Sequence, residues 1–217
     1  MIDVKICGIT EPLGLDGAIA AGARYVGLVL APKSPRFLTL DQAAALAARA
    51  RGRIEIVALL VDPADALLAA VRARLAPDWV QLHGGESPAR TAEAKAFAAK
   101  GVIKALPIAR AEDFAAVEAF AGAADQLLFD AKPPPGAARS GGHGRAFDWR
   151  LLAGRRLPRP WLLAGGLTPE NVAEAIALSG AAAVDVSSGV ERAPGLKDPD
   201  RIAAFVTAAQ QARFEAR

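Results

Sequence analysis

The chain holds one cysteine, Cys7, placed where an apolar run meets a turn in "KICGIT" (residues 5–10). A free cysteine is either a small buried hydrophobe, as most are, or a reactive thiol, and the residue alone leaves both interpretations open. Asp130 follows the apolar run Leu127, Leu128 and Phe129. An acid at the end of a buried strand is costly unless paired, so we expect a raised pKa and a chemical role for Asp130.

Two further polar side chains stand near the ends of apolar runs. Arg36 lies in "APKSPRFLT" (31–39), where a guanidinium can hold a carboxylate through two parallel hydrogen bonds. His83 lies in "QLHGGE" (81–86), where it is either held by structural hydrogen bonds or takes part in chemistry, and we expect it, with Arg36, among the substrate-binding residues. For Arg36 the alternative is an ordinary surface arginine.

Two glycine-containing loops follow late apolar runs, "LLAGGLTPENV" (162–172) and "VDVSSGVE" (184–191). Each leads toward a predicted helix start. Backbone N–H groups in such loops form a cradle for a phosphate. The expected phosphate-binding residues are Gly165, Gly166, Ser187, Ser188 and Gly189.

Short runs rich in β-branched and aromatic residues alternate along the chain with Ala/Leu segments of helical period. Helix starts are predicted at Thr39, Ser87 and Thr168, and "SGA" at 179–181 predicts a helix end. The predicted strands are Ile2–Ile6, Tyr25–Leu30, Ile54–Val61, Trp79–Leu82, Val102–Leu106, Gln126–Phe129, Trp161–Ala164 and Ala182–Val186. The predicted helices are Leu13–Ala21, Leu40–Arg51, Ala64–Leu75, Ala89–Ala99, Ala111–Ala121, Asp148–Ala153, Pro169–Leu178 and Asp200–Phe214.

Eight strand–helix units indicate an α/β protein with a parallel sheet, and eight units can close into a (β/α)₈ TIM barrel. The alternative is an open doubly wound sheet, which often carries a glycine-rich fingerprint after its first strand. "CGIT" is not that fingerprint, so the sequence favours a single barrel domain over residues 1–217. In such barrels the active site lies at the carboxyl ends of the strands, with phosphate held after strands seven and eight. All the polar groups above fall there.

The composition excludes several classes of protein. One cysteine excludes an intramolecular disulfide, and with only two histidines we expect no metal. An acidic start and arginines within the Ala-rich segments predict neither a signal peptide nor a membrane span, so a cytoplasmic location is expected. A net charge of +3 is weak evidence for a nucleic-acid partner, and we expect none.

Two features remain open. The arginines between Lys132 and Arg159 form either a solvated surface or a field that attracts anionic substrates. The loop at 132–145 is long and rich in Pro and Gly, which predicts a lid. The oligomeric state is also open, a homo-oligomer included.

These motifs together resemble phosphoribosylanthranilate isomerase of tryptophan biosynthesis, from residue 4 to about residue 206. The matching stretches are "KICGIT", "KSPR", "VQLHGGE", "LLFDAK", "SGGHG", "FDW", "LAGGLTPENV" and "VDVSSGVERAPGLKD".

The resemblance implies a (β/α)₈ barrel that needs no cofactor and acts on a small phosphorylated substrate. The implied reaction is the Amadori rearrangement of N-(5-phosphoribosyl)anthranilate to 1-(2-carboxyphenylamino)-1-deoxyribulose 5-phosphate. It implies Cys7 as general base, Asp130 as general acid and Arg36 as the group that holds the anthranilate carboxylate. The chain departs from the family at His143, where relatives usually have threonine, and its role is unassigned.

Two other functions are considered. The related isomerase of histidine biosynthesis runs the same rearrangement, but it has an aspartate where this chain has Cys7, and its two halves repeat. A barrel that binds a phosphorylated ligand without turnover is the second. The presence of Cys7, Asp130 and Arg36 together argues against it.

Overall fold

The computed structural model describes residues 1–132 and 146–215. The segment predicted to be a lid (132–145), which includes His143, therefore lies outside the described residues except for Lys132.

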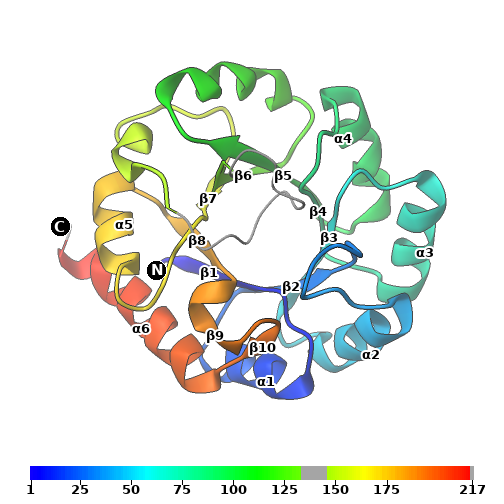
Figure 1. Ribbon diagram of the computed structural model, residues 1–217. Coiled ribbons are helices and arrows are strands. Elements are labelled where there is room, and N and C mark those ends of the chain that lie inside the picture. Colours follow the sequence, from blue (N-terminus) through cyan, green and yellow to red (C-terminus); the bar gives the residue numbers. More distant parts are fainter. Residues whose placement is uncertain (133–145, 216–217) are drawn as a thin grey trace.

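Eight parallel strands form a closed barrel in sequence order, with β8 paired to β1, as the sequence predicted (Figure 1). Helices surround the barrel on its outer face (Figure 1). The strands are β1 (Asp3–Cys7), β2 (Tyr25–Val29), β3 (Glu55–Leu60), β4 (Trp79–Leu82), β5 (Gly101–Ile108), β6 (Gln126–Ala131), β7 (Trp161–Leu163) and β8 (Ala183–Val186).

The outer layer combines α-helices with short 3₁₀ helices, and a small hairpin follows β8. The α-helices are α1 (Pro12–Ala20), α2 (Leu40–Ala50), α3 (Asp65–Leu75), α4 (Pro88–Ala94), α5 (Val172–Ser179) and α6 (Pro199–Glu215). The 3₁₀ helices are η1 (Lys95–Phe97), η2 (Ala111–Ala116), η3 (Glu118–Phe120), η4 (Trp149–Leu152) and η5 (Ser188–Val190). The hairpin consists of β9 (Glu191–Ala193) and β10 (Leu196–Lys197), and the sequence analysis did not predict it.

Two predicted α-helices, at 111–121 and 148–153, are wrong in type, because both segments form 3₁₀ helices. The buried side chains explain the difference. Phe114, Val117 and Phe120 recur at every third residue, which matches the three residues per turn of a 3₁₀ helix.

The helix starts at Thr39 and Ser87 are confirmed, since each side chain caps its helix by accepting a backbone hydrogen bond. The start predicted at Thr168 is wrong, because α5 begins at Val172. Asn171 closes a turn before α5. Its Oδ1 accepts from the Thr168 N–H, and its Nδ2 donates to the Gly166 carbonyl. The helix end is confirmed by Gly180, which adopts the left-handed conformation after α5.

Side chains alternate along each strand between the outer helices and the barrel interior. The outward set joins the strands to the helices in one large apolar core. The inward set fills the barrel with Tyr25, Val57, Trp79, Ile103, Ala105, Leu128, Leu162 and Ala164. A small cluster of Cys7, Val29 and Leu59 follows at the strand ends.

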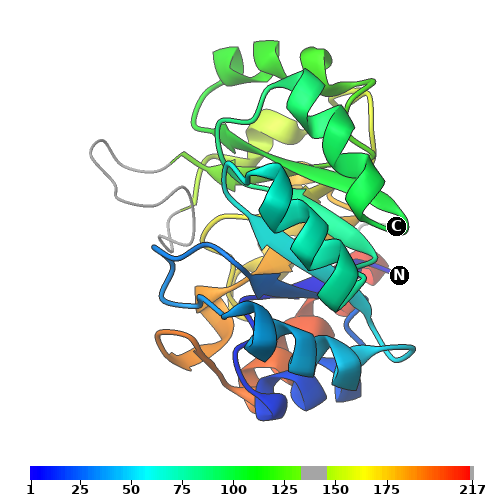
Figure 2. The same ribbon diagram turned by 90° about the vertical axis from the view of Figure 1, so that its right-hand side faces the viewer.

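The loops that follow the strands gather at one end of the barrel, called here the mouth. The 31–39 loop and the hairpin lie at this end, opposite the N-terminus (Figure 2). Among the helices that the structure describes, none has the length and apolarity needed to cross a membrane.

Replacing Thr39 with alanine should lower the free energy of unfolding by about 0.5–2 kcal/mol, because α2 loses its capping box with Gln42. Urea unfolding followed by circular dichroism measures this loss. Thr207→Ala, at an exposed position within α6, is the matched control and should not destabilise the protein. Equal stability of Thr39→Ala and the wild type would contradict the capping role.

Candidate active site

Cys7 is the last residue of β1 and lies inside the barrel, only 6% exposed. Gly27 is its partner on β2, and a Cβ at Gly27 would lie 2.9 Å from the Cys7 sulfur. Glycine is therefore required on β2 to make room for the thiol. Burial raises the pKa of Cys7, and Lys5 and Lys197 oppose this rise through their positive charges.

Lys5 lies on the same face of β1, one layer below Cys7, and is fully buried. Its Nζ is 2.8 Å from Asp185 Oδ1 on β8, and it also forms a hydrogen bond with Cys7. Burial alone would lower the pKa of Lys5, but Asp185 and Cys7 raise it further, so the ammonium stays charged. The sequence analysis missed this pair, although charged residues within the apolar runs "VKIC" and "AVDV" were a signal.

Asp130 is buried near the end of β6 and faces His83, which follows β4. Asp130 Oδ2 lies 3.3 Å from His83 Nε2, and Oδ1 accepts the N–H of Ala131 at 2.8 Å. On the other side of the ring, Gln81 Nε2 lies 3.3 Å from His83 Nδ1. Two residues predicted separately thus form one pair.

Arg36 is buried at the mouth and forms a two-pronged ion pair with Glu191. Its Nε lies 2.6 Å from Glu191 Oε1, and its Nη2 lies 2.8 Å from Oε2. The arginine stem crosses Gly8, where a Cβ would lie 2.4 Å from Arg36 Cδ. Arg36 therefore lies directly beside the residue that follows Cys7.

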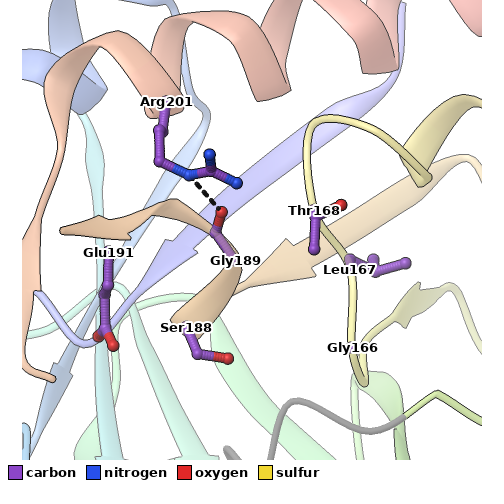
Figure 3. A pocket seen from close by; sticks show the side chains of 7 residues that line it. All are labelled: Gly166, Leu167, Thr168, Ser188, Gly189, Glu191 and Arg201. Atoms are coloured by element: carbon purple, nitrogen blue, oxygen red, sulfur yellow. Dashed lines mark hydrogen bonds between the residues drawn. The ribbon is translucent and has the colours of Figure 1, made fainter. Parts of the chain in front are cut away.

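The loops after β7 and β8 enclose a pocket of about 330 Å³ (Figure 3). Of the expected phosphate residues, Gly166, Ser188 and Gly189 line it, whereas Gly165 and Ser187 do not. Its lining is completed by Leu167, Thr168, Glu191 and Arg201. The two loops touch, since a Cβ at Gly189 would lie on the Leu167 carbonyl oxygen.

Gly165 and Ser187 have other positions in the site. Gly165 adopts a positive φ of 89°, and a Cβ there would lie 2.7 Å from the Ala131 nitrogen and 3.1 Å from Asp130 Oδ1. It allows the loop after β7 to pack against Asp130. Ser187 accepts hydrogen bonds from Lys197 through its carbonyl and its hydroxyl.

Arg201 of α6 is a pocket residue that the sequence analysis missed. Its Nε donates to the Gly189 carbonyl at 3.1 Å (Figure 3). Its Nη2 donates to Glu170. The guanidinium thus fixes the loop after β8 and adds positive charge to the pocket. No local pattern in the sequence signals it, because Arg201 comes from the first turn of α6.

These groups are suited to proton transfer on an anionic substrate. A thiol and a carboxyl group lie inside the mouth, and an arginine lies against the residue that follows the thiol. A pocket with backbone amides and a guanidinium suits a phosphate. Within residues 1–132 and 146–215, no cluster of three His, Cys, Asp or Glu residues suitable for a metal is present.

Residues 4–208 match the family described as N-(5'phosphoribosyl)anthranilate (PRA) isomerase. The chain belongs to this family. A relative, N-(5'-phosphoribosyl)anthranilate isomerase of Paracoccus denitrificans (strain Pd 1222), is 57% identical over 208 residues, which cover 96% of this chain and 97% of the relative. Members of the phosphoribosylanthranilate isomerase family are aldose–ketose isomerases of tryptophan biosynthesis, and this chain is one of them.

Solved structures agree with this assignment. Phosphoribosyl anthranilate isomerase from Thermotoga maritima superposes with a TM-score of 0.87 at 33% identity, covering 97% of this chain and all of that one. A second isomerase structure, in complex with reduced 1-(o-carboxyphenylamino)-1-deoxyribulose 5-phosphate, gives a TM-score of 0.84 at 32% identity over the same shares. The resemblance stated from the motifs is thereby confirmed.

Alkylation of Cys7 by iodoacetamide should reach half of its maximal rate at a higher pH in the folded protein than in urea. Burial disfavours the thiolate and raises the pKa of Cys7, and only the thiolate reacts. Because Cys7 is the only thiol, mass spectrometry of the label reports on this residue alone. A half-point at or below that of the unfolded chain would contradict the raised pKa.

Proposed function

We propose that Cys7 and Asp130 carry out the two proton transfers by which this isomerase converts N-(5-phosphoribosyl)anthranilate to 1-(2-carboxyphenylamino)-1-deoxyribulose 5-phosphate. The observation that carries the proposal is the placement of a buried thiol and a buried carboxyl group inside one barrel mouth, beside a pocket suited to phosphate.

Asp130 is assigned to the first step as general acid. It donates a proton to the ribose ring oxygen, the bond from that oxygen to carbon 1 breaks, and the anilino nitrogen forms an iminium with carbon 1. This role requires a proton on Asp130 when substrate binds. His83 Nε2 lies 3.3 Å from Asp130 Oδ2 and is placed to orient the carboxyl group.

Cys7 is assigned to the second step as general base. The positive iminium acidifies the hydrogen on carbon 2, and the thiolate removes it to give an enolamine. The enolamine gains a proton on carbon 1 and loses the one on its carbon 2 hydroxyl, so the isomerisation balances. Burial keeps the resting thiol protonated, whereas the cationic intermediate and Lys5 favour the thiolate when it is needed.

The substrate carries two anionic groups, a phosphate and a carboxylate, and each is assigned to a site near Cys7 and Asp130. The phosphate is placed in the pocket between Gly166 and Gly189, where Arg201 adds charge, and the anthranilate carboxylate is placed on Arg36. His83 is assigned to hold Asp130. Gly165 and Ser187 are assigned supporting contacts and not direct phosphate contacts.

We infer one domain over residues 1–217, because β8 near the end of the chain pairs with β1 at its start. We also infer a cytoplasmic location, since a sugar phosphate of amino-acid biosynthesis does not cross membranes unaided. A homo-oligomer stays a prediction.

Cys7→Ala and Asp130→Asn should each lower kcat by roughly 10²–10⁴, the usual contribution of a positioned acid or base. Loss of phosphoribosylanthranilate fluorescence, with purified protein and no added metal, measures the rate. Asp65→Asn, an exposed acid on α3, is the matched control and should keep wild-type kcat. Retention of more than about a third of kcat in either active-site variant would refute that residue's role.

A further inference from the structure

Three charged side chains at the mouth form a buried cluster, consisting of Arg36, Glu191 and Lys197. Glu191 Oε1 accepts from Arg36 Nε at 2.6 Å and from Lys197 Nζ at 2.9 Å, and Oε2 accepts from Arg36 Nη2 at 2.8 Å. The side chains of Arg36 and Glu191 are 7% and 6% exposed, and that of Lys197 is not exposed at all. Burial opposes the charge on Glu191, but Arg36 and Lys197 outweigh it and hold the pKa of Glu191 below its usual range.

The hairpin after β8 places two members of the cluster. Glu191 begins β9 and Lys197 ends β10, and the two residues are partners in the antiparallel register. The hairpin also contacts the Arg36 loop, since a Cβ at Gly195 would lie 2.8 Å from the Pro35 carbonyl oxygen. The hairpin is thus a scaffold that presents Glu191 to Arg36.

Within the cluster, two basic side chains share one carboxylate. Burial lowers the pKa of Lys197, and the charge of Glu191 opposes this fall. Lys197 Nζ donates to Glu191, the Ser187 carbonyl and the Ser187 hydroxyl, which are three acceptors for the three donors of an ammonium group. The nearby pair of Lys5 and Asp185 is neutral in sum. Arg36 keeps its charge, and Glu191 is shared between it and Lys197, so the Arg36 charge is only partly balanced by Glu191. Binding an anion to the rest of the Arg36 guanidinium is therefore favourable.

The geometry of Arg36 shows where that anion can bind. The planar, fork-shaped guanidinium of Arg36 has five N–H donors. Glu191 accepts from two of them, one on Nε and one on Nη2. The end of the fork, formed by Nη1 and the second Nη2 hydrogen, is oriented by the same contact. A carboxylate can bind that end through two parallel hydrogen bonds.

We propose that Glu191, supported by Lys197, is a positioning residue that fixes the Arg36 fork and thereby sets the preference for substrates whose aryl group carries a carboxylate. The inference rests on the proposed function, in which Arg36 holds the anthranilate carboxylate. Glu191 touches neither reacting carbon and acts on the aryl carboxylate through Arg36. It also lines the phosphate pocket, but the phosphate is common to all the ligands compared below.

The test compares two ligands that do not turn over, by calorimetric titration. One is reduced 1-(o-carboxyphenylamino)-1-deoxyribulose 5-phosphate, and the other is the same compound without the carboxylate. The wild type should prefer the first by roughly 10- to 100-fold, the range of a charge-assisted bidentate contact. Glu191→Gln should reduce that preference at least about ten-fold. Because Glu191 also lines the phosphate pocket, its removal can change the affinity for both ligands, but that change is common to both and cancels in their ratio.

Glu11→Gln is the matched control. Glu11 ties the same hairpin to the start of α1 through Arg192, with Oε1 at 3.0 Å from Nη2, and does not touch Arg36. It should keep the full preference. If Glu191→Gln does not fold, Glu191→Asp takes its place. It retains the charge but shifts the contact to Arg36, and its preference should be lower than that of the wild type.

An unchanged preference in the Glu191 variants would overturn the proposal. So would equal weakening of both ligands, because a purely structural role for the hairpin predicts that result. Failure of the proposed function is seen separately, as a wild type that lacks isomerase activity or as active Cys7→Ala and Asp130→Asn variants, since the titrations need no turnover.

Discussion

The pairing of β8 with β1 is the constraint on which the rest of the structure depends. Four residue pairs, from Asp3 with Ala183 to Ile6 with Val186, join the two ends of the chain and close the sheet. The Lys5–Asp185 ion pair crosses this seam inside the barrel. Because all eight strands are parallel, closure brings their carboxyl ends to one mouth. Cys7 from the first strand therefore meets the loop and hairpin that follow the last one.

The mouth gathers charged groups in a place that excludes most water. Isolated charges would be too costly there, and the structure pairs them as Lys5 with Asp185, His83 with Asp130, and Glu191 with Arg36 and Lys197. Lys5 with Asp185 and Arg36 with Glu191 join residues from opposite ends of the chain, so these two pairs require the closed barrel. The same dry setting raises the pKa of Cys7 and strengthens any contact between Arg36 and a carboxylate. Burial at the mouth therefore both makes an unpaired charge unfavourable and strengthens the interactions that catalysis and binding use.

The sequence predicted the barrel because eight apolar runs alternate with helical segments, and it predicted the mouth because polar residues stand at the ends of those runs. It could not distinguish 3₁₀ from α-helix at 111–121, where buried residues recur every three positions. It also missed Glu191, Lys197 and Arg201. These residues reach the site through a short hairpin and a helix turn, whose positions depend on tertiary packing that no local pattern encodes. The pairing of His83 with Asp130 likewise joins strands that are distant in sequence.

The most direct test of the central claim is a crystal structure of this chain with reduced 1-(o-carboxyphenylamino)-1-deoxyribulose 5-phosphate bound. The account predicts the phosphate between Gly166 and Gly189 and the carboxylate on the end of the Arg36 fork. It also predicts the Cys7 sulfur within about 3.5 Å of carbon 2, the distance from which a proton can be removed. A phosphate bound outside the two loops, or a sugar whose carbon 2 faces away from Cys7, would contradict the account.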